Sequence, residues 1–156
     1  METEPRVEWE SRIREVDRIT DGLMRPVDPR IKPIVIALRA NGFETSGSCE
    51  GHPDAKHGSS LPRVSFNAPL VQGGNWQAPL REFYTERSPP RDARLVVISG
   101  SKRELTLSCA AAMRMGRASE EARSVLEAAQ KQMDRFAHFL REWFFEKGLF
   151  MAKWSP

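Results

Sequence analysis

The sequence predicts an α+β fold: a mainly antiparallel sheet of about four strands, packed by two N-terminal helices and one long C-terminal helix. Two observations carry this prediction. Stretches near both ends of the chain repeat apolar side chains every three or four residues, the spacing of one helix face. Between them lie short segments rich in branched residues, separated by turn-forming residues, as expected for strands.

The composition is that of one globular domain. The chain has 156 residues, 40% hydrophobic and 29% charged, so we expect a single domain over 1–156, with 1–7 and 149–156 as flexible tails. No apolar run approaches the roughly 18 residues of a membrane helix, and the first residues lack the pattern of a signal peptide. Two cysteines are too few for a disulfide framework. We therefore expect a cytoplasmic protein with no membrane partner.

Two helices are expected before residue 42. The first covers residues 8–21, where a narrow apolar stripe begins at Trp9. The second has clear boundaries. Asp28 is a natural N-cap and Pro29 suits the first helical position. Asn41-Gly42 is a strong stop signal, because Gly42 can adopt a left-handed conformation.

The middle of the chain predicts strands joined by loops. A strand at 43–49 runs into a polar loop at 50–60, and a short helix is expected at 80–87. Branched residues at 94–99 indicate a strand central in the sheet, which forms a hairpin with the strand that follows it. The four expected strands cover residues 43–49, 61–66, 94–99 and 104–109.

The longest element is a helix over residues 120–147, capped by Ser119 and ended by Gly148. Its apolar surplus is larger than one covering helix needs, so we expect a homodimer through this C-terminal helix. The stripe that should cover the sheet consists of Ala122, Val125, Leu126, Ala129, Met133, Phe136, Leu140, Trp143 and Phe144. The surplus consists of Phe139, Phe145, Leu149, Phe150 and Trp154.

Chemically active side chains concentrate between Gly42 and His52, in the sequence Gly-Phe-Glu-Thr-Ser-Gly-Ser-Cys-Glu-Gly-His. Three kinds of site fit this stretch. The first is a metal site, in which Cys49, His52 and His57 bind zinc, with Glu50 and Asp54 available as further ligands.

The second kind is a catalytic site. His52 would activate the Cys49 thiol, and Glu50 or Asp54 would orient the imidazole or move protons. Alternatively, Cys49 is a small buried side chain that only fills space in the core. We interpret Cys109 in this second way.

The third kind is an anion site, in which hydroxyls and unhindered backbone N–H groups hold a phosphate. Serine and glycine clusters are more commonly plain turns. The residues expected to bind such a ligand are Thr45, Ser46, Ser48, Gly51 and Arg63.

The central region is basic. Residues 31–117 contain twelve basic and seven acidic residues, most of the bases being arginine. Arginine suits bidentate contacts with phosphate, so this excess favours a nucleotide or RNA partner. Solvated surface arginines are the plainer explanation.

Residues 27–52 resemble the opening of the wybutosine-biosynthesis tRNA methyltransferase family. There a similar helix leads to a Thr-Ser-Ser-Cys-Ser-Gly-Arg-type signature, which this chain matches with Thr45-Ser46-Gly47-Ser48-Cys49-Glu50-Gly51. The resemblance implies a transferase site for S-adenosylmethionine and a tRNA base at Ser46, Ser48, Cys49 and Gly51. Glu50 and His52 depart from that signature. A group of small uncharacterised bacterial and phage proteins with a Ser-Cys-Glu-Gly-His motif is more similar.

The leading hypothesis is therefore a small cytoplasmic enzyme that acts on a nucleotide or RNA, with Cys49, Glu50 and His52 as catalytic residues. Zinc and S-adenosylmethionine are the candidate cofactors. His57 and the loop at 68–78 are candidate lids. The alternative is a non-catalytic binding or regulatory module that holds an anion or a metal in the same pocket.

Overall fold

The computed structural model describes residues 4–53, 60–67, 77–100, 103–114 and 120–147. It confirms the α+β class: an antiparallel four-stranded sheet is packed by helices, among them a long C-terminal helix. In chain order the elements are α1 (Glu4–Asp17), α2 (Lys32–Ala40), β1 (Glu44–Cys49), β2 (Arg63–Asn67), α3 (Ala78–Phe83), β3 (Leu95–Ser99), β4 (Glu104–Cys109), α4 (Ala110–Arg114) and α5 (Glu120–Lys147).

The strands lie in the order β1-β2-β4-β3, and each neighbouring pair is antiparallel. The predicted hairpin of β3 and β4 is confirmed, but the predicted central position of β3 is wrong. β4 lies between β2 and β3, so β3 is at the edge of the sheet. A branched apolar run indicates burial of the strand's faces. It does not indicate how many strands lie beside it.

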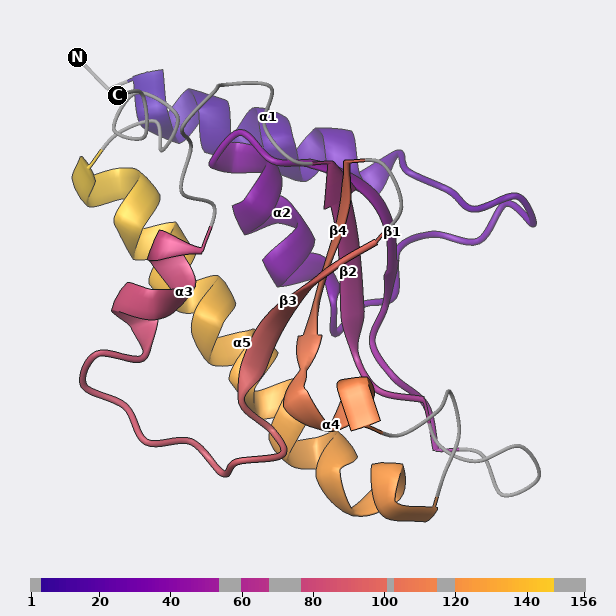
Figure 1. Ribbon diagram of the computed structural model, residues 1–156. Helices are drawn as coiled ribbons and strands as arrows, with labels where there is room; N and C mark the ends of the chain where they lie inside the picture. The colour runs from indigo at the N-terminus through magenta and orange to yellow at the C-terminus, as the bar shows by residue number, and fades with distance from the viewer. Residues whose placement is uncertain (1–3, 54–59, 68–76, 101–102, 115–119, 148–156) are drawn as a thin grey trace.

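The core lies between the sheet and the helices. In Figure 1, α1, α2, α3 and α5 lie on one side of the sheet, with α5 crossing it diagonally. All nine residues of the predicted α5 stripe are buried, so that helix phase is confirmed. The sheet residues of the same core are Val64, Phe66, Leu95, Leu105 and Leu107.

Buried polar groups join these layers. Asn41, at the C-terminal end of α2, donates from Nδ2 to the carbonyl oxygens of Ala37 (2.8 Å) and Leu140 (3.2 Å). It therefore ties α2 to α5, and the chain leaves the helix at Gly42 with φ +89°, as predicted. Tyr84 similarly donates to Gln132 Oε1 (2.9 Å) and accepts the N–H of Leu95 (2.9 Å). Burial raises the pKa of the Tyr84 hydroxyl.

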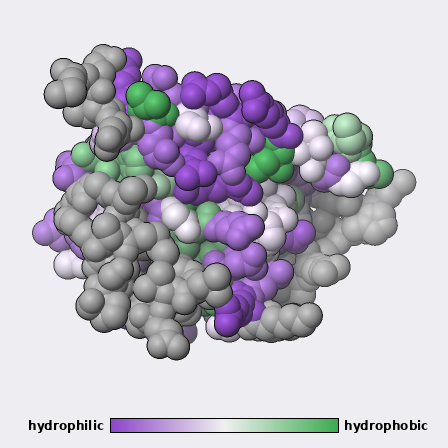
Figure 2. Space-filling view, turned by 90° about the horizontal axis from the view of Figure 1, so that it is seen from above, coloured by the Kyte–Doolittle hydropathy of each residue, from purple (hydrophilic) through white to green (hydrophobic). Residues whose placement is uncertain are grey.

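α1 covers the helical layer from outside. It begins at Glu4 and ends at Asp17, so residues 4–7, which we expected in a flexible tail, are helical. Its C-terminal end comes earlier than predicted, since Thr20 instead forms a bridge with Pro26 in a short hairpin. Seen from above, the molecule is mostly hydrophilic over this helix (Figure 2).

The two members of the apolar surplus that the structure describes, Phe139 and Phe145, contact other aromatic rings of the chain. The Phe139 ring lies 5.4 Å from Phe83 and 5.6 Å from Trp143, centroid to centroid, and Phe145 lies 5.5 Å from Trp9. Residues 149–156 lie outside the described part of the chain. Within the described part, no helix has both the length and the apolar character needed to cross a membrane.

Candidate functional site

The site forms where β1 ends and the chain turns sharply at Gly51. This glycine has φ +83°, and a Cβ at this position would lie 2.6 Å from Leu126 Cδ1 and 2.8 Å from the carbonyl oxygen of Ser60. Only glycine therefore fits the turn. The turn carries Cys49, at the end of the strand, and His52, just beyond it, onto the same side of the molecule.

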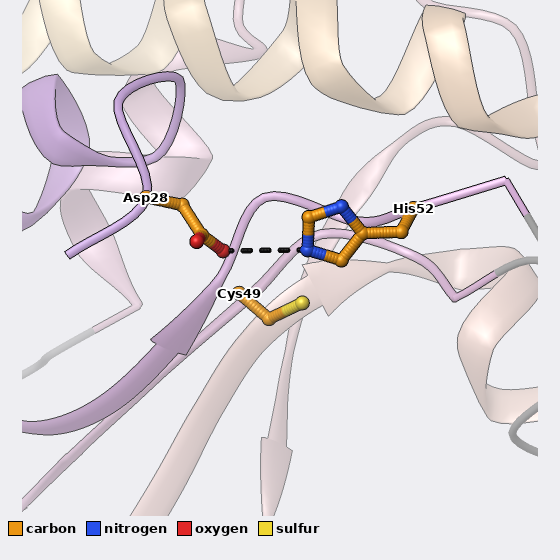
Figure 3. A group of neighbouring side chains, drawn as sticks. All are labelled: Asp28, Cys49 and His52. Carbon is orange, nitrogen blue, oxygen red and sulfur yellow. Dashed lines mark ion pairs between the residues drawn. The ribbon is translucent and has the colours of Figure 1, made fainter. Parts of the chain in front are cut away.

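Asp28 meets these two residues from the segment before α2. One donor atom from each of Asp28, Cys49 and His52 lies within 4.8 Å of the other two. His52 Nε2 lies 3.5 Å from Asp28 Oδ2. Figure 3 shows the Cys49 sulfur on the same side of the imidazole as the Asp28 carboxylate. A sulfur, a nitrogen and an oxygen donor thus converge on one point.

Asp28 was predicted as the N-cap of the second helix, and this prediction is wrong. α2 begins at Lys32 after the N-cap Ile31, with Pro33 in the first turn. The Asp28 side chain instead accepts the backbone N–H of Glu50 (3.1 Å). Nothing local in the sequence distinguishes the two roles, because the second depends on a strand some twenty residues away.

Glu50 makes further hydrogen bonds with its surroundings. Its Oε2 accepts the backbone N–H of Arg30 (2.9 Å), and its carbonyl oxygen accepts a hydrogen bond from Gln130 Nε2 of α5 (2.9 Å). Its Oε1 lies 4.0 Å from His52 Nδ1. Glu50 is therefore placed behind the imidazole, on the ring nitrogen that faces away from Asp28.

The three donors line a cavity of about 430 Å³. A β-bulge shapes its wall: Thr45 pairs with Phe66 and Gly47 with Ser65, so Ser46 is the extra residue and is exposed. Other walls come from the 20–26 hairpin and from α2. The residues that matter chemically are Asp21, Arg25, Asp28, Ser46, Ser48, Cys49, His52 and Arg63.

The hairpin at 20–26 is held by one carboxylate. Asp21 accepts the backbone N–H groups of Arg25 (2.9 Å) and Leu23 (2.8 Å), and it also accepts Arg25 Nε (2.8 Å). These bonds, with that from the Arg25 backbone the largest cause, lower the pKa of Asp21. The wall of the cavity is thus fixed by local hydrogen bonds.

Thr45 lines the cavity, but its oxygens already have partners. Arg39 donates from Nε to Thr45 Oγ1 (2.7 Å) and from a terminal nitrogen to the Thr45 carbonyl oxygen (3.0 Å). Arg39 also pairs with Glu15 of α1. Hydrogen bonding to Arg12, with the nearby Arg39 charge, lowers the pKa of Glu15. This network anchors the start of β1 to α1.

The remaining predicted site residues have different placements. Ser46, Ser48 and Arg63 reach the cavity together with Cys49 and His52, whereas Gly51 is buried in the turn. His57 and Asp54 lie outside the described residues, as does most of the loop at 68–78. Cys109 is buried, which raises the pKa of its thiol, and His138 is exposed and pairs with Glu142 (3.0 Å).

The sequence did not indicate the site roles of Asp28, Arg25 and Gln130.

No family model, curated protein or solved structure matches the chain. The resemblance to the wybutosine methyltransferases therefore remains a prediction, and the chemistry must be argued from the geometry. A thiol activated through a Cys-His-Asp relay needs sulfur and carboxylate at opposite ring nitrogens. Asp28 does not fit such a relay, because it lies on the Nε2 side together with the sulfur. Glu50 lies on the Nδ1 side, but its Oε1 is 4.0 Å from that nitrogen, longer than a hydrogen bond. Sulfur and oxygen beside Nε2 suit a shared metal ion better.

Proposed function

We propose that the chain is a small metal-dependent enzyme in which Asp28, Cys49 and His52 bind a zinc-class divalent cation. The convergence of their three donor atoms at the wall of a cavity carries the proposal. Three protein ligands leave the fourth tetrahedral position of zinc open, which is the arrangement of catalytic zinc sites. The open position would face the 430 Å³ cavity.

The supported chemistry is hydrolysis. Zinc held by Asp28, Cys49 and His52 would supply an activated water as the nucleophile of a hydrolysis. Cys49 then acts as a ligand and does not itself attack.

Glu50 has a supporting role in this proposal. Ligand histidines commonly donate their second ring N–H to a carboxylate, which fixes the tautomer and the ring orientation. Glu50 Oε1 lies 4.0 Å from His52 Nδ1, on the side away from Asp28. We therefore assign Glu50 as a positioning residue, and Cys49 and His52 as metal ligands.

The alternative is a non-catalytic metal-binding or regulatory module that uses the same three ligands. It predicts that a further ligand from the chain completes the coordination of the cation, so that no position on the metal is exchangeable. The S-adenosylmethionine expectation has less support, because no Phe, Tyr or Trp among the described residues lines the cavity to stack on adenine. A cytoplasmic location, a nucleotide or RNA substrate and a homodimer through α5 remain proposals.

Metal analysis tests the proposal directly. Protein reconstituted with zinc and then dialysed should carry about one ion per chain, and Cys49→Ala or His52→Ala should lower this content at least tenfold. Cys109→Ala and His138→Ala are matched controls, because Cys109 is buried and His138 is exposed on α5, where it pairs with Glu142. Both should retain the ion.

Substitution with cobalt(II) tests whether Cys49 is a ligand and whether one coordination position is open. With Cys49 as a ligand, the cobalt-substituted protein should show a sulfur-to-metal charge-transfer band that Cys49→Ala abolishes. Adding imidazole should perturb the spectrum if one position is open, and leave it unchanged in a closed regulatory site. Fast alkylation of Cys49 in a protein that binds no metal would contradict the metal proposal and favour the thiol as nucleophile.

A further inference from the structure

We propose that Arg63, supported by Arg25, binds the phosphate group of a small phosphate monoester whose reacting atom reaches the Asp28–Cys49–His52 site. The inference rests on the proposed function and names its substrate class. It concerns the wall of the cavity beside the three donors.

Arg63 lies beside the metal ligands because of the strand register. It is the direct cross-strand partner of Cys49 in the β1–β2 ladder, and such partners are close neighbours. Arg63 is exposed and lines the cavity. Within the part of the chain that the structure describes, no acidic side chain pairs with its guanidinium, so its donors are available to a ligand.

Arg25 also lines the cavity, from the 20–26 hairpin. Its Nε and backbone N–H donate to Asp21, and its terminal nitrogens have no partner among the described residues. The bond from Nε to Asp21 limits the positions of this exposed guanidinium. Two arginine forks that line one cavity suit a phosphate, since each fork can donate two parallel hydrogen bonds.

Hydroxyl groups at and beside the β1 bulge supply uncharged hydrogen-bond donors to the cavity. Ser46 and Ser48 line the cavity, and neither hydroxyl has a side-chain or backbone partner among the described residues. The space beside Gly47 is open, with no atom within 4 Å of where a Cβ would lie. An anion can therefore approach the backbone of β1 closely, as it does in phosphate-binding turns.

Charge favours an anion once the metal is bound. The two arginines balance Asp21 and Asp28, and a dication outweighs the Cys49 thiolate by one unit. The side chains that line the cavity, with the bound dication, then carry one net positive charge, and the Glu50 carboxylate behind His52 lies outside this lining. In a partly enclosed space Coulomb attraction is stronger than in open water.

Size and lining favour a small ester over an RNA strand. The volume of 430 Å³ lies at the lower end of small-molecule sites. Single strands of RNA are commonly held by aromatic side chains on which successive bases stack. The described cavity lining has no Phe, Tyr or Trp, and its one imidazole, His52, is assigned to the metal. The side chains at Ser65, Thr106 and Ile98, on the sheet face away from the core, are not aromatic either.

Calorimetry with AMP, adenosine, inorganic phosphate and a single-stranded oligoadenylate tests the inference on the zinc-loaded protein. AMP and phosphate should bind, and adenosine, which lacks the phosphate, should not. Arg63→Gln should weaken AMP binding at least tenfold and Arg25→Gln by a smaller factor. Arg103→Gln is the matched control: it is exposed at the other end of the sheet, outside the cavity, and should leave AMP binding unchanged.

Three results would overturn the inference: equal binding of adenosine and AMP, no effect of Arg63→Gln, or tighter binding of the oligonucleotide than of AMP. The zinc content of Arg63→Gln separates this failure from that of the proposed function. Full zinc without AMP binding contradicts only the substrate class. Failure of the wild-type protein to bind zinc contradicts the proposed function itself.

Discussion

Gly51 is the residue on which the shape of the site depends. Its positive φ turns the chain between Cys49 and His52, and its missing side chain leaves room for Leu126 of α5. The neighbouring Glu50 and Gly51 carbonyl oxygens accept hydrogen bonds from Gln130 of the same helix (2.9 and 3.5 Å). The turn is thus fixed by a helix that follows it by about eighty residues.

We expect Gly51→Ala to lower the free energy of unfolding by about 2–4 kcal/mol. The left-handed conformation strains any residue with a Cβ, and this Cβ would overlap Leu126 Cδ1 and the Ser60 carbonyl oxygen. Gly22→Ala is the control, because no atom lies within 4 Å of its Cβ position. Urea unfolding of both variants measures the difference, and equal midpoints would show that the turn is not constrained as described.

Glu15 contributes to the free energy of unfolding in a pH-dependent way, and the sign of this dependence can be predicted. Its folded-state pKa is lowered, first by the hydrogen bond from Arg12, so its stabilisation is present above the ordinary value of 4.5. It is lost as the pH falls through the lower, folded-state pKa. At pH 7, Glu15→Gln should cost roughly 0.5–1 kcal/mol, a small value because the side chain is 39% exposed.

The measurement is urea unfolding of wild type and Glu15→Gln between pH 7 and pH 2. The difference should shrink as the pH falls below 4.5. Glu127→Gln is the matched control, since Glu127 forms a pair with Lys131 but is 78% exposed. A Glu15→Gln effect that stays constant with pH would exclude the Arg12–Glu15–Arg39 network as its source.

At the scale of elements, α5 organises the molecule. Its apolar stripe covers α2 and the sheet, and its Phe136 ring packs 5.2 Å from Phe83 of α3. Through Gln132 it also reaches Tyr84, which accepts the N–H of Leu95 at the start of β3. The helix therefore fixes the position of α3 and of the edge strand together.

Phe136→Ala should destabilise the protein by about 3–5 kcal/mol, because it removes a buried aromatic ring and leaves a cavity. The ring is 4% exposed. Arg135→Ala, on the exposed side of the same helix, should change stability by less than about 0.5 kcal/mol. Thermal unfolding compares the two, and similar shifts would mean that the helix packs through a different face.

At the scale of the whole molecule, one of several exposed apolar regions in the described chain includes the C-terminal end of α5. Phe145 of α5 is 40% exposed and Val7 of α1 is 59% exposed, although Phe145 also touches Trp9. Isolated exposed apolar residues are common. The homodimer through the C-terminal helix is therefore retained as a prediction on the basis of this region and of the apolar residues beyond Lys147.

Light scattering at high micromolar concentration should give twice the chain mass of 17.7 kDa. Phe145→Glu should yield the monomer, because it places a charge in the apolar contact. Met113→Glu alters another exposed apolar residue, 64% accessible and away from α5's C-terminal end, and should leave the dimer intact. A wild-type monomer at this concentration would rule out the homodimer.

The sequence by itself determined the type and approximate range of most elements. The nine-residue stripe of α5, the stop at Asn41-Gly42 and the β3–β4 hairpin were all predictable, since each depends on hydrogen bonds and burial patterns within a few residues. The same holds for the concentration of chemical groups around Cys49 and His52, which are three positions apart.

Only the tertiary structure decided which distant residues meet them. Asp28 is a plausible helix cap from its neighbours alone, and it became a site residue because β1 passes beside it and presents the N–H of Glu50. Arg63 faces Cys49 through strand register, and the edge position of β3 follows from strand order. Register and order depend on packing between segments far apart in the chain, and local periodicity does not encode that packing.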